Sequence, residues 1–521
     1  MLDAKKVILT LADNTTNTIT DSSRLSTEED YSAVIYSKED LIINGNGTLN
    51  VNAGYRNGIK STDDCIIVSG TLNITSTEDG IIGKDLCGIV AGDININAGS
   101  DGIKSTYDTD TTKGNVIIEG GNITIKASND GIQAENILVI NDGTINIKTN
   151  NGAADTTQTH IDNMDMGRGG FGFNNNKTTT TTDDTSESRK GIKAGNMLII
   201  NDGDITIDSD DDSVHCNSVI YIYGGTINAA TGDDGVHADD LLTVNGGTIN
   251  ITQCYEGLEA DDIVINDGDI SVVSSDDGIN SSDGSITING GNLLINASGD
   301  GLDANGSIII NGGYIVVLGP TSDGDTAIDY DDSCTINGGT VMAFGSSGML
   351  EIPKGASNGA CIVTAFTSVS GGSKYTLSDS NGNEILSYTP SKAYAAAIVY
   401  SDKITTGNTY NITAGSTTLS IEVTSDVTSN VSSGFGGAGG MNKPGNGGSG
   451  MPNNGSSDNG MNGNSNGSMP DMSGNGAPDM NGNSSGDMPS MGGNSSNNSG
   501  NMPNMNNGSS NVNAPQMNNR M

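Results

Sequence analysis

The chain has 521 residues and a formal net charge of -41, from 63 acidic and 22 basic residues. This excess of negative charge argues against nucleic acids and anionic membranes as partners. No stretch is long and apolar enough to predict a membrane-spanning helix or the apolar segment of a signal peptide. We therefore expect no membrane insertion, and we expect that any export signal has been lost or lies outside this chain.

Residues 1–55 contain two stretches rich in strand-forming residues, KVILTL and DLIINGNGTLNVN. They precede a long repeat whose first unit would otherwise expose unpaired strand edges. We expect residues 1–55 to form an N-terminal β cap.

Residues 56–349 repeat the phrase D-G-I-x-A, followed by an apolar strand, an N-(G/D)-G turn and a second apolar strand. Where no insertion intervenes, the period is 22 residues, as between Gly58, Gly80 and Gly102. This unit is too short for a strand-helix-strand unit and has no helical spacing. The repeat predicts an all-β fold, a parallel β-helix in which equivalent residues of successive coils lie roughly 4.8 Å apart.

Two columns of residues should face the interior, because a coil has no other place to bury them. The first column follows the glycine of the phrase: Ile59, Ile81, Ile103, Ile132, Ile192, Val214, Val236, Leu258, Ile279, Leu302 and Ile328. The second lies two residues later: Ser61, Gly83, Ser105, Ala134, Ala194, Cys216, Ala238, Ala260, Ser281 and Ala304. Asparagines before the Gly-rich turn should form a ladder that bonds side chain to backbone: Asn141, Asn201, Asn245, Asn266, Asn289, Asn311 and Asn337.

Two insertions interrupt the period. A short loop is expected around Tyr107–Lys113, and a Thr/Gly/Asn-rich loop at about residues 150–189 is too polar to pack, so we expect it to be mobile. After the repeat, residues 350–432 keep strand-like stretches such as CIVTAF and AAAIVYSD, which predict a C-terminal β cap. Residues 433–521 are rich in Gly, Asn, Ser and Met and predict a disordered tail.

The six cysteines show no metal-binding spacing. Cys65, Cys87 and Cys334 share a column otherwise filled by leucine and isoleucine, so we expect small core residues with free thiols. A disulfide between Cys65 and Cys87, which stack in adjacent coils, is the alternative.

Acidic residues stand before most glycines of the phrase, and in several repeats the carboxylates are doubled. In a solenoid they stack coil upon coil, and like charges about 5 Å apart repel by roughly 1 kcal/mol in water and by more inside a protein. Calcium suits such oxygen ligands. The alternative is that each Asp caps its own turn. The predicted calcium ligands are Asp211, Asp212, Asp233, Asp234, Glu256, Asp276, Asp277 and Asp300.

Outward-facing residues of the phrase form two polar columns, which make a groove-like face that is basic at one end and acidic at the other. Two columns with almost no apolar member predict a ligand surface. The predicted carbohydrate-binding residues are Lys60, Lys104, Lys193, His215, His237, Glu259, Asp239, Asp261, Tyr107 and Tyr255. His215 and His237 are read as members of this surface, with a pH-sensitive pair or a metal pair as alternatives.

The ordered series NGIKSTDD, SDGIKS, NDGIQAE, DDGVHAD, YEGLEA and DDGIN resembles the clostridial carbohydrate-binding β-helix proteins, which are similar in fold to pectate lyases. The resemblance covers roughly residues 8–415. It implies a right-handed β-helix that binds calcium and plant cell-wall polysaccharides, including acidic sugars, without established lyase activity. The phrase DDSVHCN at Asp211 departs from the expected D-D-A-I-H-S-N but leaves the acidic residues intact.

Three functions remain open on the sequence. The first is a non-catalytic module, a monomer outside the cell or on its surface, that binds cellulose or acidic pectin-like glycans with calcium. The second is a polysaccharide lyase in which Lys104 or Lys193 removes a proton, with Arg189 or Lys190 nearby. The third is a structural surface rod or adhesin. The absence of tryptophan favours polar and calcium-bridged contacts over stacking on sugars.

Overall fold

The computed structural model describes residues 4–21, 31–154 and 188–431. In these ranges every regular element is a β-strand, and no helix is present that could cross a membrane. Most of the loop expected at residues 150–189 and all of the tail at 433–521 lie outside the described residues.

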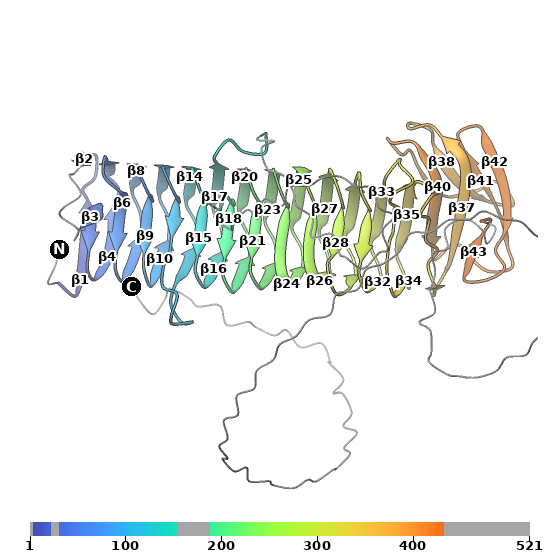
Figure 1. The fold of residues 1–521 in the computed structure, drawn as a ribbon, viewed down its shortest axis with the longest axis horizontal. Coiled ribbons are helices and arrows are strands. Elements are labelled where there is room, and N and C mark those ends of the chain that lie inside the picture. Colours follow the sequence, from blue (N-terminus) through green and yellow to red (C-terminus); the bar gives the residue numbers. More distant parts are fainter. Residues whose placement is uncertain (1–3, 22–30, 155–187, 432–521) are drawn as a thin grey trace, which may run out of the picture. The chain divides into compact units, whose positions relative to one another are not determined.

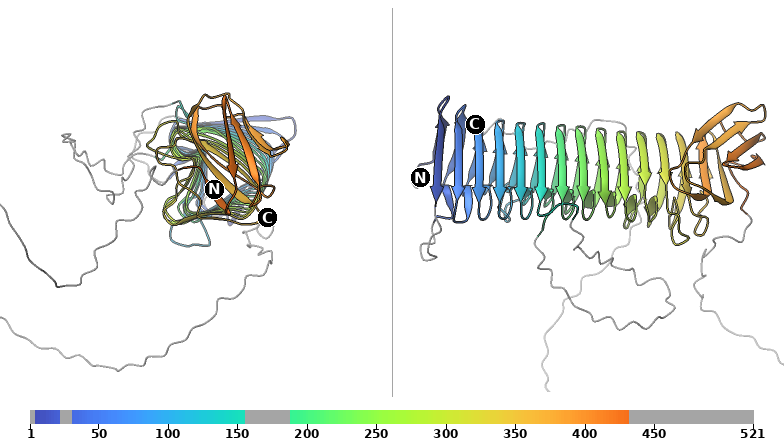
Figure 2. Two further views of the ribbon diagram at one scale, coloured as in Figure 1. Left: turned by 90° about the vertical axis from the view of Figure 1, so that its right-hand side faces the viewer. Right: turned by 90° about the horizontal axis from the view of Figure 1, so that it is seen from above.

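The strands stack into a parallel β-solenoid of about 13 turns, which confirms the predicted fold class. Figure 1 shows successive coils side by side along the chain, and Figure 2 shows the same stack from a second direction. A typical coil contributes one strand to each of three ladders. The strands of the D-G-I-x-A phrase form the first ladder. The next strand of each coil belongs to the second ladder, and the last strand of each coil belongs to the third.

The first ladder contains β3(Ala33–Ser37), β6(Asn57–Ser61), β9(Ile81–Gly83), β12(Ile103–Lys104), β15(Ile132–Ala134), β18(Ile192–Ala194), β21(Val214–Cys216), β24(Val236–Val244), β26(Leu258–Ile265), β28(Ile279–Ser281) and β31(Leu302–Ala304). The second contains β1(Lys6–Leu11), β4(Asp40–Gly45), β7(Asp64–Ile67), β10(Leu86–Ile89), β13(Asn115–Ile118), β16(Ile137–Ile140), β19(Met197–Ile200), β22(Val219–Ile222), β29(Ile286–Ile288), β32(Ser307–Ile310), β34(Ser333–Ile336) and β36(Gly355–Ala356). Strands β24 and β26 run through both ladders.

The third ladder contains β2(Thr16–Asp21), β5(Thr48–Ala53), β8(Thr71–Ser76), β11(Asp93–Ala98), β14(Asn122–Ala127), β17(Thr144–Thr149), β20(Asp204–Ser209), β23(Thr226–Thr231), β25(Thr248–Cys254), β27(Asp269–Ser274), β30(Asn292–Asn296), β33(Tyr314–Leu318) and β35(Thr340–Gly345). All neighbours in this ladder up to β35 pair in parallel.

The two predicted inward columns form the core. Every apolar residue that follows the phrase glycine, from Ile59 to Ile328, is fully buried, and the small residues two positions later are buried as well. Because side chains alternate along a strand, the residues between the two columns point outward. All six cysteines are buried and free, which confirms the core interpretation and contradicts the disulfide alternative for Cys65 and Cys87.

The asparagine ladder is present, but its hydrogen bonds differ from the expectation. The Nδ2 of Asn289 donates to Oδ1 of Asn266 at 2.8 Å, and Asn311 repeats this bond on Asn289 at 2.8 Å. The ladder therefore joins side chain to side chain between coils. Each amide has both a donor and an acceptor, so identical residues can satisfy one another along the stack.

The N-terminal strands continue the three ladders. Strand β1 pairs with β4, β2 with β5 and β3 with β6, all in parallel. Residues 6–53 thus have the strand pairing of the coils that follow, and strand pairing does not change at the predicted boundary after residue 55.

The C-terminal region leaves the parallel pattern at β37. It contains β37(Ala360–Val369), β38(Tyr375–Asp379), β39(Glu384–Tyr388), β40(Tyr394–Ser401), β41(Thr409–Ala414), β42(Thr417–Glu422) and β43(Val427–Ser429). Strand β40 pairs antiparallel with both β35 and β37. Strands β39, β38, β41 and β42 form a separate sheet, and a second core packs around Phe344, Tyr375 and Tyr394.

Candidate acidic face and histidine cluster

The acids before the phrase glycines hold successive coils together. Oδ1 of Asp79 accepts a hydrogen bond from the backbone N–H of Asp101 at 3.1 Å, and Oδ1 of Asp101 accepts one from Asp130 at 3.0 Å. Equivalent bonds run from Asp234 to Asp212, from Glu256 to Asp234, from Asp300 to Asp277 and from Thr326 to Asp300. The alternative in which each Asp caps its own turn is wrong for these residues, because each carboxylate caps the next coil.

Close packing favours a glycine after the acid, as at Gly102, although Ser213 follows Asp212. A Cβ on Gly102 would lie 2.5 Å from the carbonyl oxygen of Gly131 and 2.5 Å from Cγ2 of Ile125. No side chain fits there without moving backbone. The acid is therefore fixed in the turn, with one carboxylate oxygen bound to the next coil and the other available for a partner.

The partner of that second oxygen is the outward residue three positions later in the phrase. Lys104 Nζ lies 2.6 Å from Oδ2 of Asp101. His215 Nδ1 lies 2.8 Å from Oδ2 of Asp212, and His237 Nδ1 lies 3.2 Å from Oδ2 of Asp234. In these three coils a basic residue thus faces the acid of its own phrase.

Lys190 places a positive charge in this ladder of acids. It takes the position before Gly191 that most other coils fill with an acid. Its Nζ lies 3.0 Å from Asp211 Oδ1 and 2.5 Å from Asp212 Oδ2 in the next coil. Burial alone would lower the pKa of Lys190, but Asp212 and Asp211 raise it. Burial would likewise raise the pKa of Asp212, but Lys190 and His215 hold it well below its usual range.

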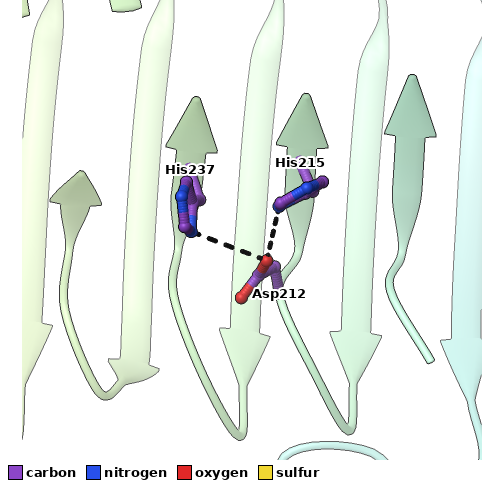
Figure 3. Close-up of side chains that lie close together, drawn as sticks. All are labelled: Asp212, His215 and His237. Atoms are coloured by element: carbon purple, nitrogen blue, oxygen red, sulfur yellow. Dashed lines mark hydrogen bonds and ion pairs between the residues drawn. The ribbon is translucent and has the colours of Figure 1, made fainter. Parts of the chain in front are cut away.

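The histidine cluster, at His215 and His237, lies in the two coils that follow the coil of Lys190. His215 and His237 are paired in register on β21 and β24, with ring centroids 4.9 Å apart (Figure 3). His237 Nδ1 also lies 3.1 Å from Oε2 of Glu259. Burial opposes a charge on His237, but the hydrogen bond with Asp234 and the charges of Asp212 and Glu259 raise its pKa to about 10.

The doubled carboxylates are not continuous. Tyr255 takes the place between Asp233 and Asp276 in the stack, because its N–H donates to Asp233 O at 2.8 Å and its carbonyl accepts from Asp276 N at 3.0 Å. Tyr255 therefore belongs to the turn and not to the outward face of the phrase strand. Burial, with Asp234 and Asp212, raises the pKa of Asp233 to about 8.

The acidic end of the face has no basic partner. Among the described residues, no lysine or arginine forms a salt bridge with Glu256, Asp277, Asp300 or Asp303. Oxygens of Asp277, Asp300 and Asp303 lie within 4.8 Å of one another. Burial and neighbouring carboxylates raise the pKa of Asp277 to about 8 and that of Asp300 to about 9.

Asp303 was not among the metal ligands expected from the sequence. It stands three positions after Asp300, the spacing at which other coils place a lysine or histidine against the acid. That spacing was the available signal. A further acidic group at Asp40, Asp63 and Asp64 was also not predicted.

The predicted carbohydrate-binding column exists in register. Its members follow one another from Lys60 through Lys104, Lys193, His215, His237 and Glu259. Ile82, which is 2% exposed, stands between Lys60 and Lys104 and interrupts the basic part.

The other residues predicted for this surface have different surroundings. Asp239 Oδ1 lies 3.5 Å from His237 Nε2, so Asp239 belongs to the histidine cluster. Asp261 Oδ1 accepts a hydrogen bond from Ser282 at 3.1 Å. The ring of Tyr107 lies near two lysines, with Lys84 Nζ 4.6 Å and Lys113 Nζ 4.8 Å from its centroid.

The sequence of this chain is similar to those of known proteins. A carbohydrate-binding domain-containing protein of Acetivibrio thermocellus is 39% identical over 75 residues, which are 14% of this chain and 26% of that protein. The chain thus matches about a quarter of the length of this curated relative. No solved structure matches. A family model described as carbohydrate-binding domain-containing protein matches residues 1–235 and 233–419. Since these two matches together span most of the solenoid and much of the C-terminal sheet region, the chain belongs to the family of carbohydrate-binding domain-containing proteins.

Proposed function

We propose that the chain is a non-catalytic module that binds plant cell-wall polysaccharide, cellulose or acidic pectin-like glycans, with the help of calcium. The observation that carries the proposal is the group of carboxylates at Glu256, Asp277, Asp300 and Asp303. These acids lie together in consecutive coils without a lysine or arginine partner among the described residues. Family membership supports a polysaccharide as the ligand.

The donor set fits calcium. Asp277, Asp300 and Asp303 offer carboxylate oxygens within 4.8 Å of one another, and Ca²⁺ takes six to eight oxygen ligands in flexible geometry. The hydroxyl of Thr326 is buried and has no hydrogen-bond partner among the described residues, while its N–H is bound to Asp300. A divalent cation would allow these acids to stay ionised side by side, because it offsets their mutual repulsion.

Among the predicted ligands, the structure favours the later coils. Lys190 already supplies a cation to Asp211 and Asp212, whereas Asp277 and Asp300 have none in the described part of the chain. We therefore place calcium first at Asp277, Asp300 and Asp303, with Glu256 and Asp276 nearby in the stack. An ion there would hold a uronate carboxylate that this acidic surface would otherwise repel.

The lysine contacts favour binding over lyase chemistry. A lysine base must lose its proton near neutral pH. Burial opposes the charge of Lys104, but Asp101 raises its pKa, and Lys190 is held protonated by two carboxylates. Lys193 donates to Ser188 Oγ at 3.1 Å and has no described carboxylate partner. Because Lys104 and Lys190 are held in the charged form, we keep the lyase as the second candidate, and the structural rod as the third.

Sedimentation with polygalacturonate and with cellulose, with and without a chelator, tests the proposal. The double variant Asp277→Asn with Asp300→Asn should lose calcium-dependent binding to polygalacturonate. Asp142→Asn with Asp202→Asn is the matched control, because it removes the same charge from N-D-G turns, where each Asp caps only its following glycine at 2.7 and 2.8 Å.

The ultraviolet absorbance of unsaturated products is recorded in the same samples. If the parent chain forms unsaturated product and Lys104→Gln abolishes it, the lyase replaces the non-catalytic binding module as the favoured function. If the chain binds neither glycan with calcium present, the structural rod becomes the remaining candidate function.

A further inference from the structure

Two imidazoles and three carboxylates form two neighbouring groups of donor atoms that share His237. His215 Nδ1 and His237 Nδ1 lie 2.8 and 3.9 Å from the same oxygen, Oδ2 of Asp212 (Figure 3). His237 Nδ1 also lies 3.2 Å from Asp234 Oδ2 and 3.1 Å from Glu259 Oε2. Both rings thus turn the same nitrogen toward carboxylate oxygens.

The other nitrogen of each ring faces a hydrogen-bond acceptor. His215 Nε2 lies 2.8 Å from Asn217 Oδ1, and His237 Nε2 lies 3.5 Å from Asp239 Oδ1. An acceptor there favours the hydrogen on Nε2, which leaves the lone pair of a neutral ring on Nδ1. A lone pair and a carboxylate oxygen face each other favourably only with a proton or a metal cation between them. Metal-binding histidines commonly donate their remote N–H to such an outer acceptor.

The donor atoms also differ in kind from those of the acidic end. Asp212, His215 and His237 form one group, and Asp234, His237 and Glu259 form another, with the donor atoms within 4.8 Å of one another in each. Asp212 is 1% exposed and His215 is 9% exposed, so the donors are fixed on buried ladder positions. Imidazole nitrogen combined with carboxylate suits zinc and related transition ions, whereas calcium takes oxygen ligands.

We propose that this histidine cluster binds one divalent transition-metal ion of the zinc type through the two Nδ1 atoms and neighbouring carboxylates. The residues involved are Asp212, His215, Asp234, His237 and Glu259. The site is distinct from the calcium group at Asp277, Asp300 and Asp303 and does not depend on it, although His215, His237 and Glu259 also belong to the column predicted to bind glycan. Lys190 Nζ lies 2.5 Å from Asp212 Oδ2, so its ammonium competes with the ion for this oxygen.

Calorimetric titration of the full-length, chelator-treated chain with Zn²⁺ tests the inference. The buffer contains excess Ca²⁺, so that oxygen-only sites are filled first. We expect one Zn²⁺ per chain, with affinity at least tenfold weaker in His215→Gln and in His237→Gln. His160→Gln is the matched control, because it removes the third histidine of the chain, which lies outside the described residues. Lys190→Gln should bind Zn²⁺ more tightly than the parent.

Three results would overturn the site: no Zn²⁺ binding, binding that survives both histidine variants, or binding that excess Ca²⁺ abolishes. A second measurement needs no variant. The visible absorption of the Co²⁺-loaded parent should differ from that of the aqueous ion through nitrogen coordination, and a spectrum identical to the aqueous ion would also refute the site. Glycan binding enters neither measurement, so the outcome is distinct from that of the proposed function.

Discussion

The Nζ of Lys190 lies 2.5 Å from Oδ2 of Asp212, which belongs to the next coil of the solenoid. A lysine here stands in a ladder position that acids fill in most other coils. The chain thus neutralises one segment of its acidic stack by itself. Further along, at Asp277 and Asp300, no described lysine or arginine does so.

Lys190→Gln should destabilise the protein strongly. It leaves Asp212, which is 1% exposed, without its buried cation, and breaking such a pair costs about 3–5 kcal/mol. Lys148→Gln is the control, because the Lys148–Asp208 pair is 41% and 42% exposed and should contribute about 1 kcal/mol or less. Thermal unfolding in chelator compares the two variants. Equal effects would show that Lys190 is not the counter-charge of this ladder.

Removing divalent ions should lower the melting temperature of the parent chain, and Ca²⁺ should restore it better than Mg²⁺. The acids at Asp277, Asp300 and Asp303 supply flexible oxygens, whereas Mg²⁺ demands near-ideal octahedral geometry. In chelator at about pH 9, where both acids lose their protons, Asp277→Asn with Asp300→Asn should melt above the parent, since it removes their repulsion and keeps an Oδ1 for the next coil. A melting curve unchanged by excess chelator would refute structural calcium.

The pH dependence of the chelated protein follows from the raised pKa values of Asp277 and Asp300. These acids bind protons more tightly in the folded protein, with pKa values of about 8 and 9, than in the unfolded chain, where the value is 3.8. Their ionisation therefore costs folded-state stability. The free energy of unfolding should fall as pH rises from about 4 to about 9. Denaturant titrations should show a smaller slope in the Asp277→Asn, Asp300→Asn variant, and an equal slope would contradict the assignment.

Lys104 and Lys193 of the polar column should respond differently to substitution. Lys193 hydrogen-bonds to the Ser188 hydroxyl and forms no ion pair with a described carboxylate, so Lys193→Gln should weaken polygalacturonate binding about two- to fivefold without changing stability. Lys104→Gln should lower stability as well, because it leaves Asp101, 3% exposed, unpaired. Parallel binding and melting measurements separate these effects. Unchanged binding in both variants would remove the basic end from the ligand surface.

The period of the sequence predicted which residues stack, since a fixed spacing allows only one register. The buried isoleucine column and the outward line from Lys60 to Glu259 follow from that register alone. The first strands were harder to assign. Residues 6–53 lack the D-G-I-x-A phrase in most of their length, yet backbone pairing needs no particular side chains, so β1 to β5 join the same ladders.

The partners of the acids could not be predicted, because a period gives the position of a residue and not the direction of its side chain. Whether Asp101 bonds its own turn or the next coil depends on the turn geometry fixed by close packing at Gly102. The pairing of Asp101, Asp212 and Asp234 with the residue three positions later depends on the same geometry. For that reason the sequence did not indicate that Asp303 lies with Asp300 as a ligand.

The reversed direction of β40 against β35 has a consequence for assembly. A parallel ladder could be lengthened by another chain only if its last strand offered a free edge of matching direction. In the third ladder that edge is taken by β40, and the far side of β40 is taken by β37. At this end a second chain therefore cannot add a parallel strand directly to β35, and head-to-tail extension of the third ladder in its parallel pattern is blocked.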